Sequence, residues 1–474
     1  MVFKRGGSDL AKDLRTWLKE LDEKVPGELV RVSKELDPSA FEATAVLDQM
    51  ESRGRFEGVL FEKVKDLRGR VSPFKILMNT FGTVRKIGVA LDIPEGKRIE
   101  IIERMLERQT KAVKPLRIST EEAPVKKVIV KGDGLDLRNL PIVRHVDMDG
   151  GPYLTPIIVS KDPGGKRYNV SWNRMMYLDS RHLGIYMSPR HLWSYFSKAE
   201  AQGKNIPIGV VLGHHPAFHI TGALLTPMNE DEYDAAGGVL GEPLRIVPSE
   251  IYGEELLVPA DSEMIIEGEI HVNRRVVEGP FGEFTGYSGS QRLACLFEAK
   301  AITCRPDAVI IDIFPCKTEH LNAHLPIEAS IYGKVKEAVP TVKETCWIGS
   351  GGPFHLIISL KKTMEGQPLR AAMAALSASN FLKHVIVVDE DINPANLQEV
   401  MWAIATRVQA SENVVILKGL QGHVLDPSVR HEIRSDGMII DATKPIDRPF
   451  PKRGEVPGEV LQRIRLEDYL NTNH

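Results

Sequence analysis

The chain contains only four cysteines in 474 residues, and none of them forms a Cys-x-x-Cys pair. The four are Cys295, Cys304, Cys316 and Cys346. Such wide spacing excludes both a dense disulfide framework and a zinc ribbon. Reduced thiols are the simplest interpretation, and they favour a location in the cytoplasm.

The sequence also lacks any long run of apolar residues. Runs such as residues 308–311 are far shorter than the roughly 20 residues that a membrane-spanning helix needs. Lys4 and Arg5 lie near the start, but no apolar stretch follows them, so we expect no signal peptide. These absences predict a cytoplasmic protein without a membrane span.

No block of like charges and no internal repeat stands out in the sequence. The net charge is −3, which argues against an electrostatic nucleic-acid footprint. Hydrophobic residues make up 42% and charged residues 26%, as in ordinary soluble enzymes. A chain of 474 residues is too long for one ordinary core, so we expect two or three domains.

The first part of the chain has the pattern of an α/β unit. Apolar residues at three- and four-residue spacing predict an amphipathic helix over residues 8–21, capped by Ser8 or Asp9. Strands and helices then alternate to about residue 115. We expect strands near 29–32, 59–62 and 75–78, and helices near 39–51, 83–91 and 97–112.

The pattern changes twice further along. Many short β-rich stretches between residues 126 and 314 predict a β-barrel or a strongly bent sheet. The strands are expected near 126–130, 154–160, 168–178, 183–187, 207–213, 263–272, 292–303 and 308–313, with one helix near 190–202. After about residue 330 the α/β alternation returns, with helices near 327–338, 368–380 and 396–407 and strands near 355–360, 384–389 and 413–417. The proline-containing tail from residue 445 should end in a short helix near 458–470.

Four segments carry residues that are able to do chemistry. The first, Asn169–Arg174, combines two amides, a hydroxyl and a cation in an otherwise apolar region. Strict strand alternation places Asn169 and Arg174 on opposite faces, so one shared site requires a bulge or a turn between them. A solvated edge strand is the alternative for this segment taken alone.

The second segment is Ser188–Trp193, which reads as the start of a helix. Ser188 is a suitable cap, and Pro189 suits the first turn, in which His191 also lies. The free N–H groups of a helix N-terminus favour phosphate. An ordinary surface histidine is the alternative reading of His191.

The third segment, Glu230–Gly238, is an acidic run of the kind that usually begins a solvated helix. Glu232 is also a candidate metal ligand. An amide oxygen, an imidazole and a carboxylate together suit Mn²⁺ or Mg²⁺ and leave positions for phosphate oxygens. They do not suit a structural zinc site.

The fourth segment, Glu278–Tyr287, has two carboxylates that flank a turn rich in glycine and proline. Such a turn is able to aim Glu278 and Glu283 at one point. Paired carboxylates near a cation give one ionised group and one group with a shifted pKa, which together are suited to general acid–base catalysis. An ordinary acidic loop is the alternative, because a short Glu-x₄-Glu spacing is a weak signal.

His214, His215 and His219 also resemble metal ligands. They do not form the helical His-Glu-x-x-His pattern, and Pro216 would break a helix there. We therefore favour a structural role for them. The alternative, a metal-dependent hydrolase, would use these histidines with nearby acidic residues.

Read together, these segments resemble the UbiD family of prenylated-FMN-dependent decarboxylases. The likeness covers nearly the whole chain. Each motif alone is a weak signal of the family, but the order of the motifs and the intervals between them are specific to it. It includes Gly27–Val32, Asn169–Arg174, Ser188–His191, Glu232–Tyr233 with the following Ala-Gly-Gly, Glu278–Glu283, Lys383–Asp391, Trp402–Arg407 and Asp441–Lys444.

The resemblance implies roles for individual residues. Asn169, His191 and Glu232 are expected to bind a divalent metal, Mn²⁺ or Mg²⁺, that bridges the protein to the phosphate of prenylated FMN, with K⁺ nearby. Arg174, Glu278 and Glu283 match the catalytic set. Contacts to the cofactor are further expected from Ser171, Trp172, Asn173, Arg174, Arg190 and Lys383.

The resemblance also implies an architecture and partners. An N-terminal α/β domain (1–122, joined by about 315–332) should precede a split β-barrel flavin domain (123–314). A C-terminal α/β oligomerisation domain (333–452) and a tail (453–474) should follow. The expected partners are an aromatic or unsaturated carboxylic acid, a flavin prenyltransferase and a second copy in a homodimer, or more copies in a hexamer. A non-catalytic flavin-binding subunit of a carboxylase complex is the other alternative.

Overall fold

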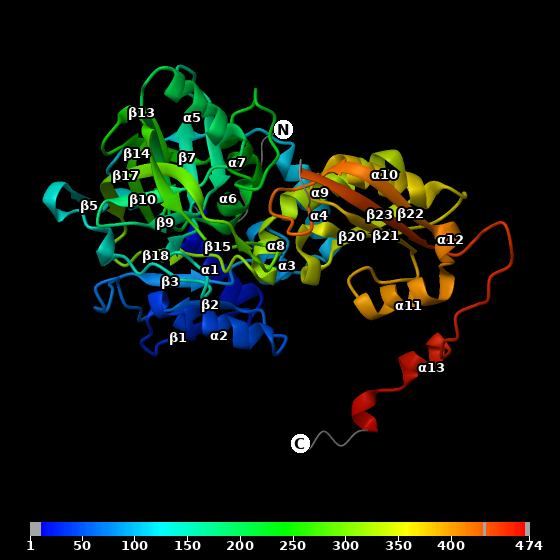
Figure 1. Ribbon diagram of the computed structural model, residues 1–474. Helices are drawn as coiled ribbons and strands as arrows, with labels where there is room; N and C mark the ends of the chain where they lie inside the picture. Colours follow the sequence, from blue (N-terminus) through cyan, green and yellow to red (C-terminus); the bar gives the residue numbers. More distant parts are fainter. Residues whose placement is uncertain (1–10, 430–432, 470–474) are drawn as a thin grey trace.

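The computed structural model describes residues 11–429 and 433–469. Three sheets with their covering helices follow one another along this part of the chain (Figure 1). The N-terminal and C-terminal units are mixed α/β, and the central unit is a curled β half-barrel. This is the predicted three-part architecture.

The N-terminal unit has a four-stranded sheet in the order β1-β2-β3-β18. Its elements are β1 (Leu29–Val32), β2 (Gly58–Phe61), β3 (Lys75–Met78), α1 (Leu14–Lys24), α2 (Glu42–Glu51), α3 (Val84–Ala90) and α4 (Arg98–Gln109). Helix α1 buries Leu14, Trp17 and Leu21, which explains its apolar spacing. The predicted start at residue 8 was wrong, because residues 11–13 are not helical and Asp13 accepts the capping hydrogen bond from the Thr16 N–H. The predicted caps Ser8 and Asp9 lie outside the described residues.

Strand β18 (Val309–Ile311) corrects a second expectation. We placed residues 308–313 in the central β-rich region, but β18 pairs in parallel with β3 of the N-terminal sheet. The strand is buried on both faces. Its apolar run therefore carries no pattern that indicates which sheet it joins.

The central unit is built on a nine-stranded sheet in the order β6-β9-β10-β17-β14-β11-β7-β8, with β5 also paired to β17. Its strands are β5 (Val128–Lys131), β6 (Tyr153–Leu154), β7 (Ile157–Lys161), β8 (Tyr168–Trp172), β9 (Met175–Tyr177), β10 (His182–Ile185), β11 (Ile206–Val211), β14 (Met264–Glu278) and β17 (Arg292–Cys304). The register of β14 against β17 shifts at Gly268 and again before Arg275. A Cβ at Gly268 would collide with the Glu298 carbonyl and the Phe297 ring, so the first shift requires glycine. These shifts let the long hairpin bend around the core.

Smaller elements complete the central unit. A three-stranded sheet and a two-stranded sheet lie beside the half-barrel, and three helices connect its strands. They are β4 (Leu116–Arg117), β12 (Arg245–Ser249), β13 (Gly253–Pro259), β15 (Phe281–Gly282), β16 (Ser288–Gly289), α5 (His191–Ala201), α6 (Pro216–Thr221) and α7 (Glu232–Leu240).

The C-terminal unit is a five-stranded sheet in the order β19-β20-β21-β23-β22. Its elements are β19 (Val342–Trp347), β20 (His355–Leu360), α10 (Gln367–Ala378), β21 (His384–Asp389), α11 (Leu397–Arg407), α12 (Ala410–Asn413), β22 (Val414–Gln421) and β23 (Arg434–Ala442). Helices α8 (Thr318–Ala323) and α9 (Leu325–Ala338) join this unit to the others. Helix α9 packs on α4 and on α10, and Arg98 of α4 pairs with its buried Glu328 at 2.6 Å. The tail helix α13 (Gly458–Arg463) stands apart from the rest of the chain in Figure 1.

Candidate active site

A cavity of about 780 Å³ lies where the half-barrel, α8, α9 and the C-terminal unit meet. Residues 421–425 of the C-terminal unit and residues 222–228 of the central unit form parts of its wall. Most of the predicted site residues line it: Asn169, Ser171, Trp172, Asn173, Arg174, Arg190, His191, Glu232 and Glu283. The fold therefore brings together side chains that are more than 100 residues apart in the sequence.

A break between two strands turns Arg174 toward the cavity. Strand β8 ends at Trp172 and β9 begins at Met175, so Asn173 and Arg174 lie outside both strands. The Asn173 side-chain amide donates to the Tyr186 carbonyl at 3.0 Å and fixes the chain there. Because alternation stops at this point, Asn169 and Arg174 reach the same cavity, as the predicted irregularity required.

Arg174 binds both predicted glutamates. Its Nε donates to Glu278 Oε1 at 2.9 Å, and its Nη2 lies 3.2 Å from Glu278 Oε2. Its Nη1 donates to Glu283. The guanidinium also lies over two rings, 4.6 Å from the centroid of Tyr186 and 4.9 Å from that of Phe281. The hydrogen bonds and the two rings thus hold the guanidinium group in one orientation.

The two glutamates have different surroundings. Glu278 is fully buried and accepts three hydrogen bonds, two from Arg174 and one from the Tyr153 hydroxyl at 3.0 Å. These three donors hold the Glu278 side chain in place, outside the described lining of the cavity. Burial raises the pKa of Glu283, against the opposing charge of Arg174. Of the pair, Glu283 is therefore the carboxyl that is set up to hold a proton.

The loop that carries Glu283 is supported from behind by residues 149–153. Asp149 accepts from the Gly282 N–H at 2.9 Å, and the Gly150 N–H donates to the Pro280 carbonyl at 2.8 Å. The Tyr153 ring packs on Phe281 with centroids 4.5 Å apart. In front of the loop, a Cβ at Gly289 would lie only 2.9 Å from Glu283 Oε1. The carboxyl of Glu283 is therefore confined from both sides.

The amide, imidazole and carboxylate of the predicted metal site meet at one point. His191 Nδ1 lies 2.7 Å from Glu232 Oε1, and the Asn169 side-chain amide donates to Glu232 Oε2 at 2.7 Å. Asn169 and Glu232 are buried, and the Ser171 hydroxyl lies 3.2 Å from Asn169 Oδ1. The set has one nitrogen and otherwise oxygen donors, which fits a divalent ion such as Mn²⁺ or Mg²⁺. The three come from β8, the start of α5 and the start of α7.

Arg190 and Lys383 are placed differently. Arg190, rather than Ser188, precedes the first residue of α5, so the predicted cap was wrong. Its guanidinium lines the cavity and makes no hydrogen bond or ion pair with residues 11–429 or 433–469. Such a cation fits an anionic group such as a phosphate. Lys383 lies outside the described lining of the cavity, where it pairs with Asp426 at 2.8 Å and Ser428 at 2.6 Å.

The three clustered histidines form no metal centre with one another. The His214 N–H donates to His219 Nε2, and the His215 N–H donates to His214 Nδ1. The Ala217 N–H donates to His215 Nδ1 and caps α6. One nitrogen of each imidazole therefore accepts a hydrogen bond from a backbone N–H. Burial lowers the pKa of all three histidines. This arrangement agrees with the structural role that we favoured.

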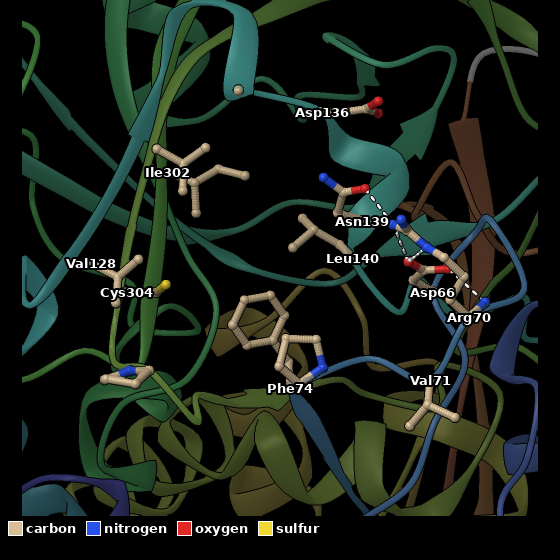
Figure 2. Close-up of a pocket in the computed structure, with 14 residues that line it drawn as sticks. Asp66, Arg70, Val71, Phe74, Val128, Asp136, Asn139, Leu140, Ile302 and Cys304 are labelled. Carbon is tan, nitrogen blue, oxygen red and sulfur yellow. Dashed lines mark hydrogen bonds and ion pairs between the residues drawn. The ribbon is translucent and has the colours of Figure 1, made fainter.

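A second cavity, of about 480 Å³, lies between loop 66–74 and strands β5 and β17 (Figure 2). Its charged groups already have partners, because Arg70 donates to Asp66 and to Asn139, each at 2.8 Å, and Asp136 pairs with Arg138 at 2.8 Å. Burial raises the pKa of Cys304 to about 11, which makes this thiol a poor nucleophile. We assign no chemistry to this cavity.

Several residues of the site were not found from the sequence. Tyr153, Asp149 and Tyr186 contact the Arg–Glu–Glu set or its loop, and His320, His324 and His423 line the cavity. Nothing in their local patterns distinguishes them from core or surface residues. The turn at Gly150–Gly151–Pro152, directly before Tyr153, was the one available signal.

Three family models match successive parts of the chain. They describe the N-terminal domain (residues 21–106), the Rift-related domain (residues 117–318) and the C-terminal domain (residues 320–442) of 3-octaprenyl-4-hydroxybenzoate carboxy-lyase, UbiD. The chain belongs to the UbiD family. It is a UbiD-like decarboxylase, a carboxy-lyase, as the resemblance predicted.

Curated relatives of this UbiD protein include two kinds of decarboxylase. The anhydromevalonate phosphate decarboxylase of Methanothermobacter thermautotrophicus is 33% identical over 430 residues, which are 87% of this chain and 96% of that protein. The phenolic acid decarboxylase of Sedimentibacter hydroxybenzoicus is 31% identical over 462 residues, 94% of each chain.

Solved structures of UbiD enzymes have the same fold over their whole length. HmfF from Pelotomaculum thermopropionicum, in complex with FMN, gives a TM-score of 0.88 at 36% identity and covers 97% of this chain and 100% of its own. An evolved dimeric form of HmfF, in complex with prFMN, gives a TM-score of 0.85 at 35% identity over the same shares. Among the described residues of our UbiD protein, no helix is long and apolar enough to span a membrane.

Proposed function

We propose that this UbiD-family enzyme reversibly removes carbon dioxide from an aromatic, heteroaromatic or α,β-unsaturated carboxylic acid, with prenylated FMN as cofactor and Glu283 as proton donor. The observation that carries the proposal is the Arg174–Glu278–Glu283 set, which lines or backs a cavity of 780 Å³ beside the Asn169–His191–Glu232 trio. The relatives that act on phenolic acids or on anhydromevalonate phosphate, and the relative that holds prFMN, support it.

The cofactor is required by the chemistry of the reaction. When carbon dioxide leaves an sp² carbon, no amino-acid side chain is an adequate sink for the electrons left behind. Prenylated FMN, when bound, supplies that sink. Asn169, His191 and Glu232 would hold Mn²⁺ or Mg²⁺ at its phosphate, with K⁺ nearby, and the unpaired Arg190 would neutralise part of the phosphate charge.

The chain's own residues then bind the substrate and move one proton. Arg174 orients the substrate carboxylate, because its guanidinium is held by Glu278 and by the two rings. The bond between the carboxylate and the ring or alkene carbon breaks, and carbon dioxide leaves. The O–H of Glu283 gives its proton to the same carbon, and Glu283 is reprotonated from solvent. High bicarbonate would drive the same steps in reverse.

Replacement of the proton donor tests the proposal. We expect Glu283→Gln, produced together with a flavin prenyltransferase, to fold and to retain its flavin spectrum. Its decarboxylation rate should fall by about 10²–10⁴-fold, which is the usual contribution of a positioned acid. Glu328→Gln is the matched control, because it removes another buried Arg–Glu pair, with Arg98, outside the proposed machinery. Parent-like carbon dioxide release by Glu283→Gln would refute the role of Glu283.

Several further expectations belong to the same proposal. We propose that the enzyme acts as a homodimer through its C-terminal unit, in the cytoplasm, and that the domain limits fall near residues 122, 314 and 452. The relative described as a dimeric form supports the first point. An intact Arg174–Glu278–Glu283 set argues against a non-catalytic assembly subunit. The hydrogen bonds of His214, His215 and His219 to the backbone argue against a hydrolase built on them.

A further inference from the structure

A buried histidine lies between two aspartates behind the loop that carries Glu283. His145 Nε2 lies 2.6 Å from Asp312 Oδ1, and His145 Nδ1 lies 3.8 Å from Asp149 Oδ2. Each of the three residues is at most 2% exposed, and all three lie outside the described lining of the cavity. The steps proposed above therefore make no direct use of this buried Asp–His–Asp trio.

Both ring nitrogens of His145 face a carboxyl oxygen, and this geometry determines the charge of the ring. Nε2 donates to Asp312 Oδ1, because a carboxylate only accepts hydrogen bonds. A neutral ring would then present the lone pair of Nδ1 to Asp149, and no described residue donates a hydrogen bond to Nδ1. Burial opposes a charge, but the carboxyl groups of Asp312, Asp149 and Glu319 raise the pKa of His145 above the ordinary histidine value. The ring is therefore an imidazolium.

Asp312 connects this imidazolium to the N-terminal sheet. Asp312 directly follows β18, and its N–H donates to the carbonyl of Leu77 in β3 at 3.0 Å. Its Oδ2 atom makes no hydrogen bond with residues 11–429 or 433–469, so His145 is its side-chain partner in this part of the chain. Because an isolated buried charge is costly, Asp312 and His145 each require the other.

Asp149 connects the imidazolium to the loop of the proposed proton donor. Its Oδ2 atom accepts from two backbone N–H groups of its own segment, at 2.9 and 3.1 Å. Its Oδ1 atom accepts from the N–H of Gly282 at 2.9 Å, and Gly282 directly precedes Glu283. The position of Glu283 therefore depends on the position of the Asp149 carboxylate, which faces His145.

His145 also packs directly on the loop. Its ring lies edge-on to the ring of Phe281, with centroids 5.9 Å apart and an angle of 80° between the planes. Phe281 lines the cavity, and its centroid lies 4.9 Å from the guanidinium carbon of Arg174. A displacement of the imidazole would therefore change the surroundings of Arg174 as well as those of Glu283.

We propose that His145 is a positively charged positioning residue for the decarboxylation, which bridges Asp312 of the N-terminal unit to Asp149 and so holds Glu283 at the cavity. This inference rests on the proposed function and deepens it, because it names residues outside the cavity on which the placement of the proton donor depends. The cation offsets the repulsion between two buried carboxylates. Without the cation, Asp149 has no counter-charge and the loop is no longer held in one place.

Two variants remove a charge from the trio and keep the hydrogen bond. His145→Gln retains an N–H donor for Asp312, and Asp312→Asn retains the Oδ1 acceptor. With cofactor-loaded enzyme and either cinnamate or 4-hydroxybenzoate as the probe acid, we expect kcat of each variant to fall by about tenfold or more, because the proton donor is misplaced. KM should stay close to that of the parent, because Glu278 still binds Arg174. His271→Gln is the control, since it removes another histidine–glutamate pair, with Glu298 at 2.8 Å, outside the described lining.

Hydrogen exchange and the pH profile separate positioning of the loop from general stability. The backbone N–H groups of residues 278–289 should exchange about tenfold faster or more in both variants, and this measurement needs no substrate. Burial raises the pKa of Glu283, and a looser loop admits water to it. The pKa of Glu283 should therefore be raised less, so kcat should be lost at a lower pH than in the parent.

The double variant His145→Gln/Asp312→Asn separates positioning from a purely structural role. Its neutral, hydrogen-bonded pair replaces a broken ion pair, so its unfolding temperature should return toward that of the parent. Its kcat should stay low, because Asp149 still lacks its cation. Recovery of kcat together with the unfolding temperature would overturn the inference, as would parent-like kcat and exchange in both single variants. In either case, an inactive Glu283→Gln would leave the proposed function standing.

Discussion

At the scale of single residues, the site depends on how two glutamates share one arginine. Glu278 receives three hydrogen bonds and is fully buried, while Glu283 receives one from Arg174 and lines the cavity beside Gly289. The difference assigns the proton to Glu283 without any difference in side-chain chemistry. Tyr153 contributes to this difference, because its hydroxyl supplies the third hydrogen bond to Glu278.

Tyr153→Phe tests that contribution. The variant keeps the ring that packs on Phe281 but removes the 3.0 Å hydrogen bond to Glu278. A hydrogen bond to a charged group contributes about 1.5–3 kcal/mol, so we expect kcat to fall by about tenfold or more while the flavin spectrum is unchanged. Tyr332→Phe is the control, since it removes another tyrosine–glutamate bond, to Glu103, away from the cavity. A parent-like kcat for Tyr153→Phe would show that the hydroxyl does not matter.

At the scale of elements, the loop at Phe281–Glu283 takes its position from the segment behind it. Asp149 accepts from three backbone groups, the N–H of His145, of Val146 and of Gly282. It therefore ties the loop to its own segment in the interior of the protein. Because Asp149 holds the loop through the Gly282 N–H, the Phe281 and Glu283 side chains remain free to line the cavity.

Asp149→Ala should loosen this loop. The substitution leaves three N–H groups, two of them buried, without their acceptor, which costs on the order of 3 kcal/mol of unfolding free energy. We expect urea unfolding at a lower midpoint and a lower kcat. An unchanged midpoint would mean that other groups satisfy these donors.

Some elements were predicted correctly from the sequence, and others were not. Helices with a clear apolar stripe, such as α5 and α9, begin and end within a few residues of their predicted limits. Strand β18 was assigned to the wrong sheet, because the sequence of a strand that is apolar on both faces does not indicate which strands it pairs with. The break between β8 and β9 was expected only because a single site for Asn169 and Arg174 needed it.

The candidate site divides in the same way. The charged and amide residues were found because such groups are unusual in an apolar region. Tyr153 was missed, because its contact is with Glu278, 125 positions away, and no local pattern records it. The role of Lys383 stays a prediction, since the structure pairs it with Asp426 and Ser428.

At the scale of the whole molecule, the cavity of 780 Å³ lies where the half-barrel, α8, α9 and the C-terminal unit meet, and the tail lies outside the three sheet-containing units (Figure 1). Apolar side chains of the tail are exposed, among them Val456 at 55%, Leu461 at 60% and Leu466 at 63%. A six-residue helix such as α13 has little stability alone, so the tail is expected to pack on another copy.

Removal of residues 454–474 tests this expectation and leaves in place Arg453, which pairs with Glu399 at 3.6 Å. Because nearly all described residues of the removed segment are exposed, the truncated protein should unfold at the same temperature when dilute and monomeric. Its dimer should dissociate at higher protein concentrations than the parent dimer does, as measured by light scattering. A lower unfolding temperature at every concentration would show that the tail stabilises its own chain instead.

The central claim is that Glu283 holds the proton that the reaction consumes, and infrared difference spectroscopy of the carboxyl band tests it most directly. Burial raises the pKa of Glu283, so its neutral form should persist above the usual glutamic acid range, near 4.3, and disappear as pH rises through the raised pKa. Decarboxylation should fall over the same interval, because only the protonated form donates. We predict a neutral carboxyl band in the parent that is absent from Glu283→Gln and titrates together with kcat. A band that is already lost within the usual glutamic acid range, or that survives in Glu283→Gln, would contradict the account.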